Sequence, residues 1–104
     1  MNEELVRVIS QQLIETAGDV IISRIGRDNI EMIAVKIAEY RIRVDSETNL
    51  EKKVELEKDI SFLESSLLLK TEIKKLKLSA KARAALKAAI QVALKTQFPF
   101  LMFI

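Results

Sequence analysis

Glycine and proline are scarce in this chain, with two glycines and one proline among 104 residues. Tight turns and strand ends depend on these residues, so a chain that lacks them has few turns and long elements. The scarcity therefore favours helices over the many short strands of a sandwich or a barrel. Hydrophobic residues make up 49% of the chain and charged residues 31%, which indicates a folded domain rather than a disordered segment. The length suits a single helical domain over residues 1–104.

Residues that typically begin or end helices divide the chain. Gly26 is followed by Asp28 and, three residues later, by Glu31, which is an Asp-headed version of the capping box. Thr48 heads a second box, and Ser79 precedes an alanine-rich stretch. Helices are predicted at about residues 3–25, 29–45, 49–77 and 80–97, followed by an apolar tail at 98–104.

A β-hairpin over about residues 19–44 is the minority alternative, because this region is rich in isoleucine and valine and partly alternates in polarity. It would give an α+β fold. Lys36 would then lie among the apolar residues of one strand face, and the strand would be unusually long, so helices are preferred. Gly18 allows a break or a bend inside the first predicted helix.

The longest continuous helical pattern covers residues 49–77, ~29 residues or roughly 43 Å of helix. Two apolar seams run along opposite sides of it. Leu56, Ile60, Leu63 and Leu67 form the first seam, and Phe62, Leu69, Ile73 and Leu76 form the second. A helix that is apolar on both sides is packed between partners. We therefore expect an all-α antiparallel bundle around a long central helix at about 49–77, with a homo-oligomeric, coiled-coil-like interface along one seam.

The basic residues are concentrated in the final third of the chain. Residues 70–95 contain Lys70, Lys74, Lys75, Lys77, Lys81, Arg83, Lys87 and Lys95. Glu72 is the one acidic residue in that range, whereas acidic residues outnumber basic ones before it. A lysine stripe of this kind neutralises phosphates along a nucleic-acid backbone without reading bases. The other interpretation is a solvated face that pairs with the acidic part of the chain.

The tail is almost entirely apolar and contains Phe98, Phe100 and Phe103. An exposed patch this rich in phenylalanine invites aggregation, so we expect the tail to pack against its own oligomer or against a protein partner. A basic helix followed by an apolar tail is also typical of a membrane-surface anchor. The apolar side of the preceding helix is mostly alanine, which buries little area in lipid, so a membrane is the least expected partner.

Catalytic and metal-binding side chains are poorly represented, since the chain has no cysteine and no histidine. Glu47, Glu51, Glu55 and Asp59 stand at i, i+4 spacing, but interleaved lysines indicate a solvated face with ion pairs. No glycine-rich phosphate loop is present. We therefore expect no enzyme activity, no metal and no cofactor. No stretch reaches the ~20 apolar residues of a bilayer span, and we expect a cytoplasmic protein.

These patterns predict a non-enzymatic structural or adaptor protein. It would self-associate through its helical seams and present the basic helix and the apolar tail to a partner. The alternative is a small nucleic-acid-binding accessory protein that contacts the phosphate backbone through the lysine stripe. A peripheral membrane-surface protein is the second alternative.

Overall fold

The computed structural model describes residues 3–99, and every regular element within that range is a helix. The helices are α1 (Glu3–Ala17), α2 (Asp19–Ile25), α3 (Arg27–Ser46), α4 (Leu50–Leu68), α5 (Thr71–Lys74) and α6 (Ala80–Gln97). The all-α prediction is confirmed. The hairpin alternative is wrong, because α2 and α3 occupy the region where it was expected.

Gly18 and Gly26 set the sharp turns on either side of α2. Gly18 has φ 88° and ψ 157°, and Gly26 has φ 90° and ψ 142°. This combination of positive φ and extended ψ is essentially restricted to glycine. The amide of Gly18 nevertheless donates to the carbonyl of Ile14, and its own carbonyl accepts from the amide of Ile22, both at 3.0 Å. The first predicted helix is therefore broken at Gly18, where the sequence allowed a break.

The start of α3 differs from the predicted capping box of Asp28 and Glu31. Gly26 is the N-cap residue, and no side chain caps the helix at that position. The side-chain amide of Asn29 instead donates to the carbonyl of Ile25 at 2.7 Å, which satisfies an acceptor at the end of α2. Gly26 is both the C-cap of α2 and the N-cap of α3. Asp28 therefore lies inside α3 and not in the cap position that the capping box requires.

Side-chain caps begin both α4 and α6. Asn49, one residue beyond the predicted Thr48, accepts a hydrogen bond from the amide of Lys52 at 3.2 Å. Ser79 accepts from the amide of Ala82 at the same distance, which confirms the cap predicted there. Each bond satisfies one of the amides that a helix leaves without a partner in its first turn.

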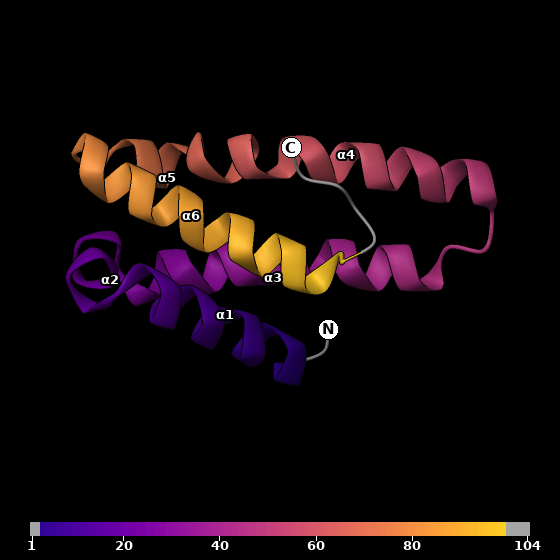
Figure 1. The fold of residues 1–104 in the computed structure, drawn as a ribbon, viewed down its shortest axis with the longest axis horizontal. Helices are drawn as coiled ribbons and strands as arrows, with labels where there is room; N and C mark the ends of the chain where they lie inside the picture. The colour runs from indigo at the N-terminus through magenta and orange to yellow at the C-terminus, as the bar shows by residue number, and fades with distance from the viewer. Residues whose placement is uncertain (1–2, 100–104) are drawn as a thin grey trace.

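The helices pack into a body of 41 × 27 × 22 Å. α1 packs on α3 and on α6, and α4 packs on α3 and α6 from the other side. Figure 1 shows α4 along one edge of the molecule and α1 along the opposite edge, with α3 and α6 between them. Within residues 3–99, α4 therefore has neighbours on one side only, and the prediction that it is the central helix is wrong.

The core is formed by aliphatic side chains together with Phe98, which is the largest fully buried side chain in the described range. Ile9 and Leu13 of α1 meet Ile33 and Ile37 of α3 in one continuous cluster, and all four are fully buried. Among residues 3–99, no polar or charged residue is buried. Apolar burial is therefore the main source of stability.

The helix predicted over residues 49–77 is also shorter than the sequence pattern indicates. α4 ends at Leu68, and a separate short helix, α5, follows the break. Leu69 and Ile73 would share one face of an unbroken helix, because they are four residues apart. In the structure Leu69 is 65% exposed and Ile73 only 4% exposed. The break at Lys70 turns Ile73 into the core while Leu69 stays at the surface, and the prediction of one helix over 49–77 is wrong.

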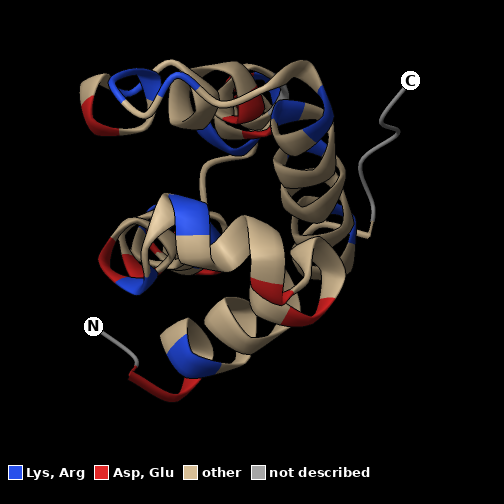
Figure 2. Cartoon of the chain, turned by 90° about the vertical axis from the view of Figure 1, so that its left-hand side faces the viewer, with Lys and Arg blue, Asp and Glu red and all other residues tan. Residues whose placement is uncertain are grey.

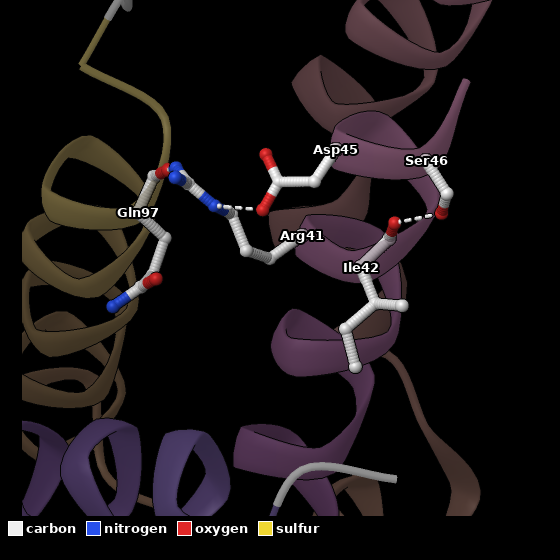
Figure 3. A network of polar contacts seen from close by, with 5 residues as sticks. All are labelled: Arg41, Ile42, Asp45, Ser46 and Gln97. Carbon is white, nitrogen blue, oxygen red and sulfur yellow. Dashed lines mark hydrogen bonds and ion pairs between the residues drawn. The ribbon is translucent and has the colours of Figure 1, made fainter. Parts of the chain in front are cut away.

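Arg41 joins α3 to the end of α6 (Figure 3). Its Nε donates to Oδ2 of Asp45 at 2.9 Å, and its Nη1 donates to the carbonyl of Gln97. That carbonyl lies in the last turn of α6, where backbone acceptors have no partner within the helix. The contact stabilises the end of α6 just before the buried Phe98.

Candidate functional site

The described residues offer no arrangement typical of a catalytic or metal centre. No group of three or more acidic side chains between residues 3 and 99 could hold a metal ion. Glu47, Glu55 and Asp59 do line one hollow between α3 and α4, but Arg43 and Lys52 line it too. No helix in the same range is long and apolar enough to cross a membrane. The surface features that remain are apolar and basic patches.

The first predicted seam is covered within the chain. Its residues face α3 and α6, and each is at most 9% exposed: Leu56, Ile60, Leu63 and Leu67. Ile73 of the second seam is also buried in the core. A second copy of the chain therefore has no access to these residues, and they leave the candidate interface.

The opposite side of α4 carries four exposed apolar side chains, with the exposed polar residues Glu51, Lys58 and Ser65 on the same side of the helix. We call it the outer face of α4 and define it by Leu50, Val54, Phe62 and Leu69, which are 75, 40, 70 and 65% exposed. At 100° per residue these four lie within about 120° of one another around the helix axis. Phe62 and Leu69 belong to the second predicted seam, whereas Leu50 and Val54 were not among the predicted interface residues. Their i, i+4 spacing, continued by Phe62 eight residues on, is the signal that could have found them.

The other predicted interface residues divide between the core and the surface. Leu76 is 37% exposed and lies beyond the end of α4. Phe98 is fully buried in the core of its own chain, so it is not part of a tail that contacts a partner. Phe100 and Phe103 lie outside the described residues.

The predicted basic stripe is not continuous, because the chain turns between α4 and α6. Four of its residues instead surround one hollow of about 730 Å³ at the junction of α4, α5 and α6: Lys74, Lys75, Lys77 and Arg83. We call this the basic hollow. Leu69, Thr71 and Leu78 complete its lining. Figure 2 views the molecule from this end and shows basic segments gathered over α5 and the start of α6.

The four cations of the basic hollow have no carboxylate partner within 4.0 Å among residues 3–99. Lys87 differs from them, because its Nζ lies 3.8 Å from Oε1 of Glu64 on α4. Gln91 Nε2 donates to the same oxygen at 3.5 Å. Pairing with the acidic part of the chain, which the sequence left open for the whole stripe, thus occurs at Lys87.

The remaining basic residues of the stripe lie outside the lining of the hollow. Lys81 and Lys95 are exposed on α6, and Lys70 is partly exposed at the start of α5. The structure thus brings four of the eight predicted residues together and separates the others. Thr71 and Leu78 had not been predicted, and their position depends on the turn between α5 and α6, which no glycine or proline signals.

Comparisons with known proteins identify no similar protein. No protein-family model matches the chain, and neither curated proteins nor solved structures give a significant match. The outer face of α4 and the basic hollow are the two surface features that distinguish the described part of the chain.

Proposed function

We propose that the chain is a self-associating structural or adaptor protein and that two copies pair through the outer face of α4. The observation that supports this proposal is the exposure of Leu50, Phe62 and Leu69 on the side of α4 opposite its buried seam. Single exposed apolar residues are ordinary on a protein surface, but a row of them along one helix face is typical of an interaction site.

A second copy in antiparallel orientation suits this face. An antiparallel pair brings the Leu50 end of one α4 against the Leu69 end of the other, so that both ends find an apolar contact. Glu51 and Glu55 are exposed near the first end, and Lys70 follows the second. Lys52 and Lys53 also lie near the first end, so the charge contribution is limited to the approach of Glu51 and Glu55 of one copy to Lys70 of the other. The two-fold symmetry of such a pair closes the assembly as a dimer.

The size of the face sets the expected affinity. The 19 residues of α4 span ~28 Å, and a helix side about 10 Å wide gives a footprint of roughly 300 Å². Standard interfaces bury roughly 800 Å² on each partner. We therefore expect a reversible dimer with a Kd on the order of 100 µM rather than a permanent one.

Sedimentation velocity over a concentration series from about 10 µM to 1 mM tests the proposal. The wild-type chain should shift from a monomer to a dimer across this range. Phe62→Glu places a charge at the middle of the outer face and should keep the chain monomeric throughout. A wild-type chain that stays monomeric at the highest concentration would contradict the proposal.

Val20→Glu is the matched control. Val20 on α2 is 71% exposed, against 70% for Phe62, so both substitutions replace an exposed apolar side chain by a carboxylate. Val20 does not lie on α4, and its substitution should leave the dimer intact. Equal loss of the dimer in both variants would show that added negative charge, rather than the outer face, controls association.

The tail after Pro99, with Phe100 and Phe103, is a second element that we propose for contact with a protein partner. Its support is compositional, since the tail is apolar throughout. The cytoplasm is the compartment we propose, and fractionation of cells that produce the native protein tests it.

A further inference from the structure

The basic hollow lies where three helices meet, at the end of α4, along α5 and at the start of α6. Lys74, Lys75 and Lys77 come from the segment that breaks away from α4, whereas Arg83 lies in the first turns of α6. The turn between α5 and α6 is what brings the two groups to one site. Residues separated by a helix break thus share a single concave surface.

The four cations of the hollow form no ion pair with a described carboxylate, and Glu72 on α5 is the one acidic residue near them in the sequence. No carboxylate between residues 3 and 99 lies within 4.0 Å of its four cations, whereas Lys87 on the neighbouring face of α6 pairs with Glu64. The first turn of α6 also has no acidic residue, so its positive end adds to the same potential. Four like charges around a hollow repel one another unless an anion neutralises them.

The backbone at the hollow supports a functional interpretation. Lys77 has φ 47° and is the one non-glycine residue with positive φ in the described range. Lysine rarely adopts this conformation, which favours glycine, asparagine and aspartate. Strained backbone of this kind clusters at functional positions, and here it occurs at a residue whose side chain lines the hollow.

We propose that the basic hollow binds the phosphodiester backbone of nucleic acid without reading its sequence. Its four cations surround an open hollow at the surface, where several phosphates of one backbone can reach them at the same time. Exposed Lys81 on α6, with the small residues Ala84 and Ala88 beside it, extends the cationic surface away from the hollow and allows close approach.

Apart from Arg83, the same surface lacks the side chains that usually read or stack on bases. The described residues that line the hollow include no aromatic, asparagine or glutamine side chain. Gln91, the nearest amide along the exposed side of α6, is hydrogen-bonded to Glu64. A single arginine gives little base discrimination, so we expect contact mainly with phosphates and an affinity that depends strongly on salt and little on sequence.

Fluorescence anisotropy of the full chain with a labelled random-sequence DNA duplex of about 20 base pairs tests the proposal. If four phosphates are neutralised, the logarithm of the affinity falls with the logarithm of salt concentration with a slope near −3.6. Affinity should therefore drop roughly 100-fold between 50 and 200 mM salt. No binding at 50 mM salt would overturn the proposal.

Lys74→Gln with Lys75→Gln removes two cations from the hollow and should halve the salt slope, with at least a ~10-fold loss of affinity at 50 mM salt. Lys77→Asn removes a third cation, and asparagine tolerates the left-handed backbone, so the fold should persist. Circular dichroism of each variant verifies that it is folded.

Lys52→Gln with Lys53→Gln is the matched control, since it removes two adjacent lysines from α4 away from the hollow. This variant should retain the salt slope of the wild type. Equal losses in the two double variants would assign binding to net charge and overturn the hollow as the site. Binding to vesicles of phosphatidylcholine and phosphatidylserine, with no binding to the duplex, would assign the hollow to anionic lipid and also overturn the proposal.

Discussion

Gly18 and Gly26 show how single residues determine the path of this chain. Both have positive φ with extended ψ, so any side chain at these positions is strained whatever the surrounding space. A Cβ added at Gly26 would have Asn29 Nδ2 as its nearest neighbour, at 4.0 Å, and one added at Gly18 would meet nothing within 4 Å. The cost of substitution is thus a backbone cost rather than a steric one.

Gly26→Ala should lower the free energy of unfolding by about 1–3 kcal/mol, since alanine cannot adopt this conformation without strain. Urea denaturation measures the change. Thr16→Ala, at an exposed position in α1, is the control and should change stability by less than about 0.5 kcal/mol. If Gly26→Ala were as stable as the wild type, the junction of α2 and α3 would differ from the one described.

Glu4 and Arg7 form an exposed ion pair in the first turns of α1. A hydrogen bond from Arg7 and its charge hold the pKa of Glu4 below the ordinary value of 4.5. A lowered folded-state pKa means that the pair stabilises the fold above the ordinary value and loses this contribution as pH falls through the lowered one. Arg7→Gln should raise the pKa of Glu4 toward 4.5, which NMR titration of the carboxyl carbon measures. An unchanged pKa would show that the pair is not formed in solution.

At the scale of helices, the sequence predicted the existence of most elements but not the end of α4. The scarcity of glycine and proline and the 3.6-residue periodicity predicted helices, and Ser79 predicted the start of α6. The residues at the break, Leu68, Leu69 and Lys70, are good helix formers, so nothing local announces it. Burial of Ile73 against the rest of the core overrides this local preference.

Phe98 illustrates the same limit at the end of α6. Its place next to an apolar tail predicted contact with a partner, but tertiary packing buries it completely in its own chain. An apolar residue in a sequence pattern is expected to be buried. Which surface covers it depends on how the helices are arranged, and the pattern does not give that arrangement. The prediction that Phe98 is covered by apolar side chains is therefore correct, but these side chains belong to its own chain and not to a partner.

Phe98→Ala should destabilise the fold by about 3–5 kcal/mol, because it removes the largest fully buried side chain among residues 3–99. Phe62→Ala is the control, since Phe62 is 70% exposed and its removal should cost less than about 1 kcal/mol. Thermal or urea denaturation measures both. A chain that ends at Pro99 keeps Phe98 and should retain its fold, whereas equal destabilisation by both alanine substitutions would contradict the assignment of Phe98 to the core.

For the whole molecule, the sequence identified the chemistry of the surfaces but not their shape. All four cations of the basic hollow were among the eight predicted basic residues. A continuous helix would have spread them along a stripe, whereas the break after α4 gathers Lys74, Lys75 and Lys77 beside Arg83. The break could not be predicted, and so neither could the hollow. The same holds for the outer face of α4, which is exposed because α4 packs at the edge of the described helices.

Leu69 belongs to both proposed surfaces, since it ends the outer face of α4 and lines the basic hollow. Leu69→Glu should therefore weaken self-association, by placing a charge in the apolar face, and also weaken duplex binding, by placing a carboxylate among the cations. The salt slope for the duplex should shrink by about one ion, ~0.9. Phe62→Glu should affect self-association alone, and Lys74→Gln with Lys75→Gln should affect duplex binding alone.

Sedimentation velocity and anisotropy on these three variants separate the two surfaces. If Leu69→Glu weakened only one of the two measurements, the surfaces would not meet at this residue. If Phe62→Glu weakened duplex binding as strongly as Leu69→Glu, the duplex would require the paired chains, and by linkage the duplex would promote pairing to the same extent. Leu69 thus lies where the break after α4 places an exposed apolar face next to a cluster of unneutralised cations, and its substitution tests both consequences of that break.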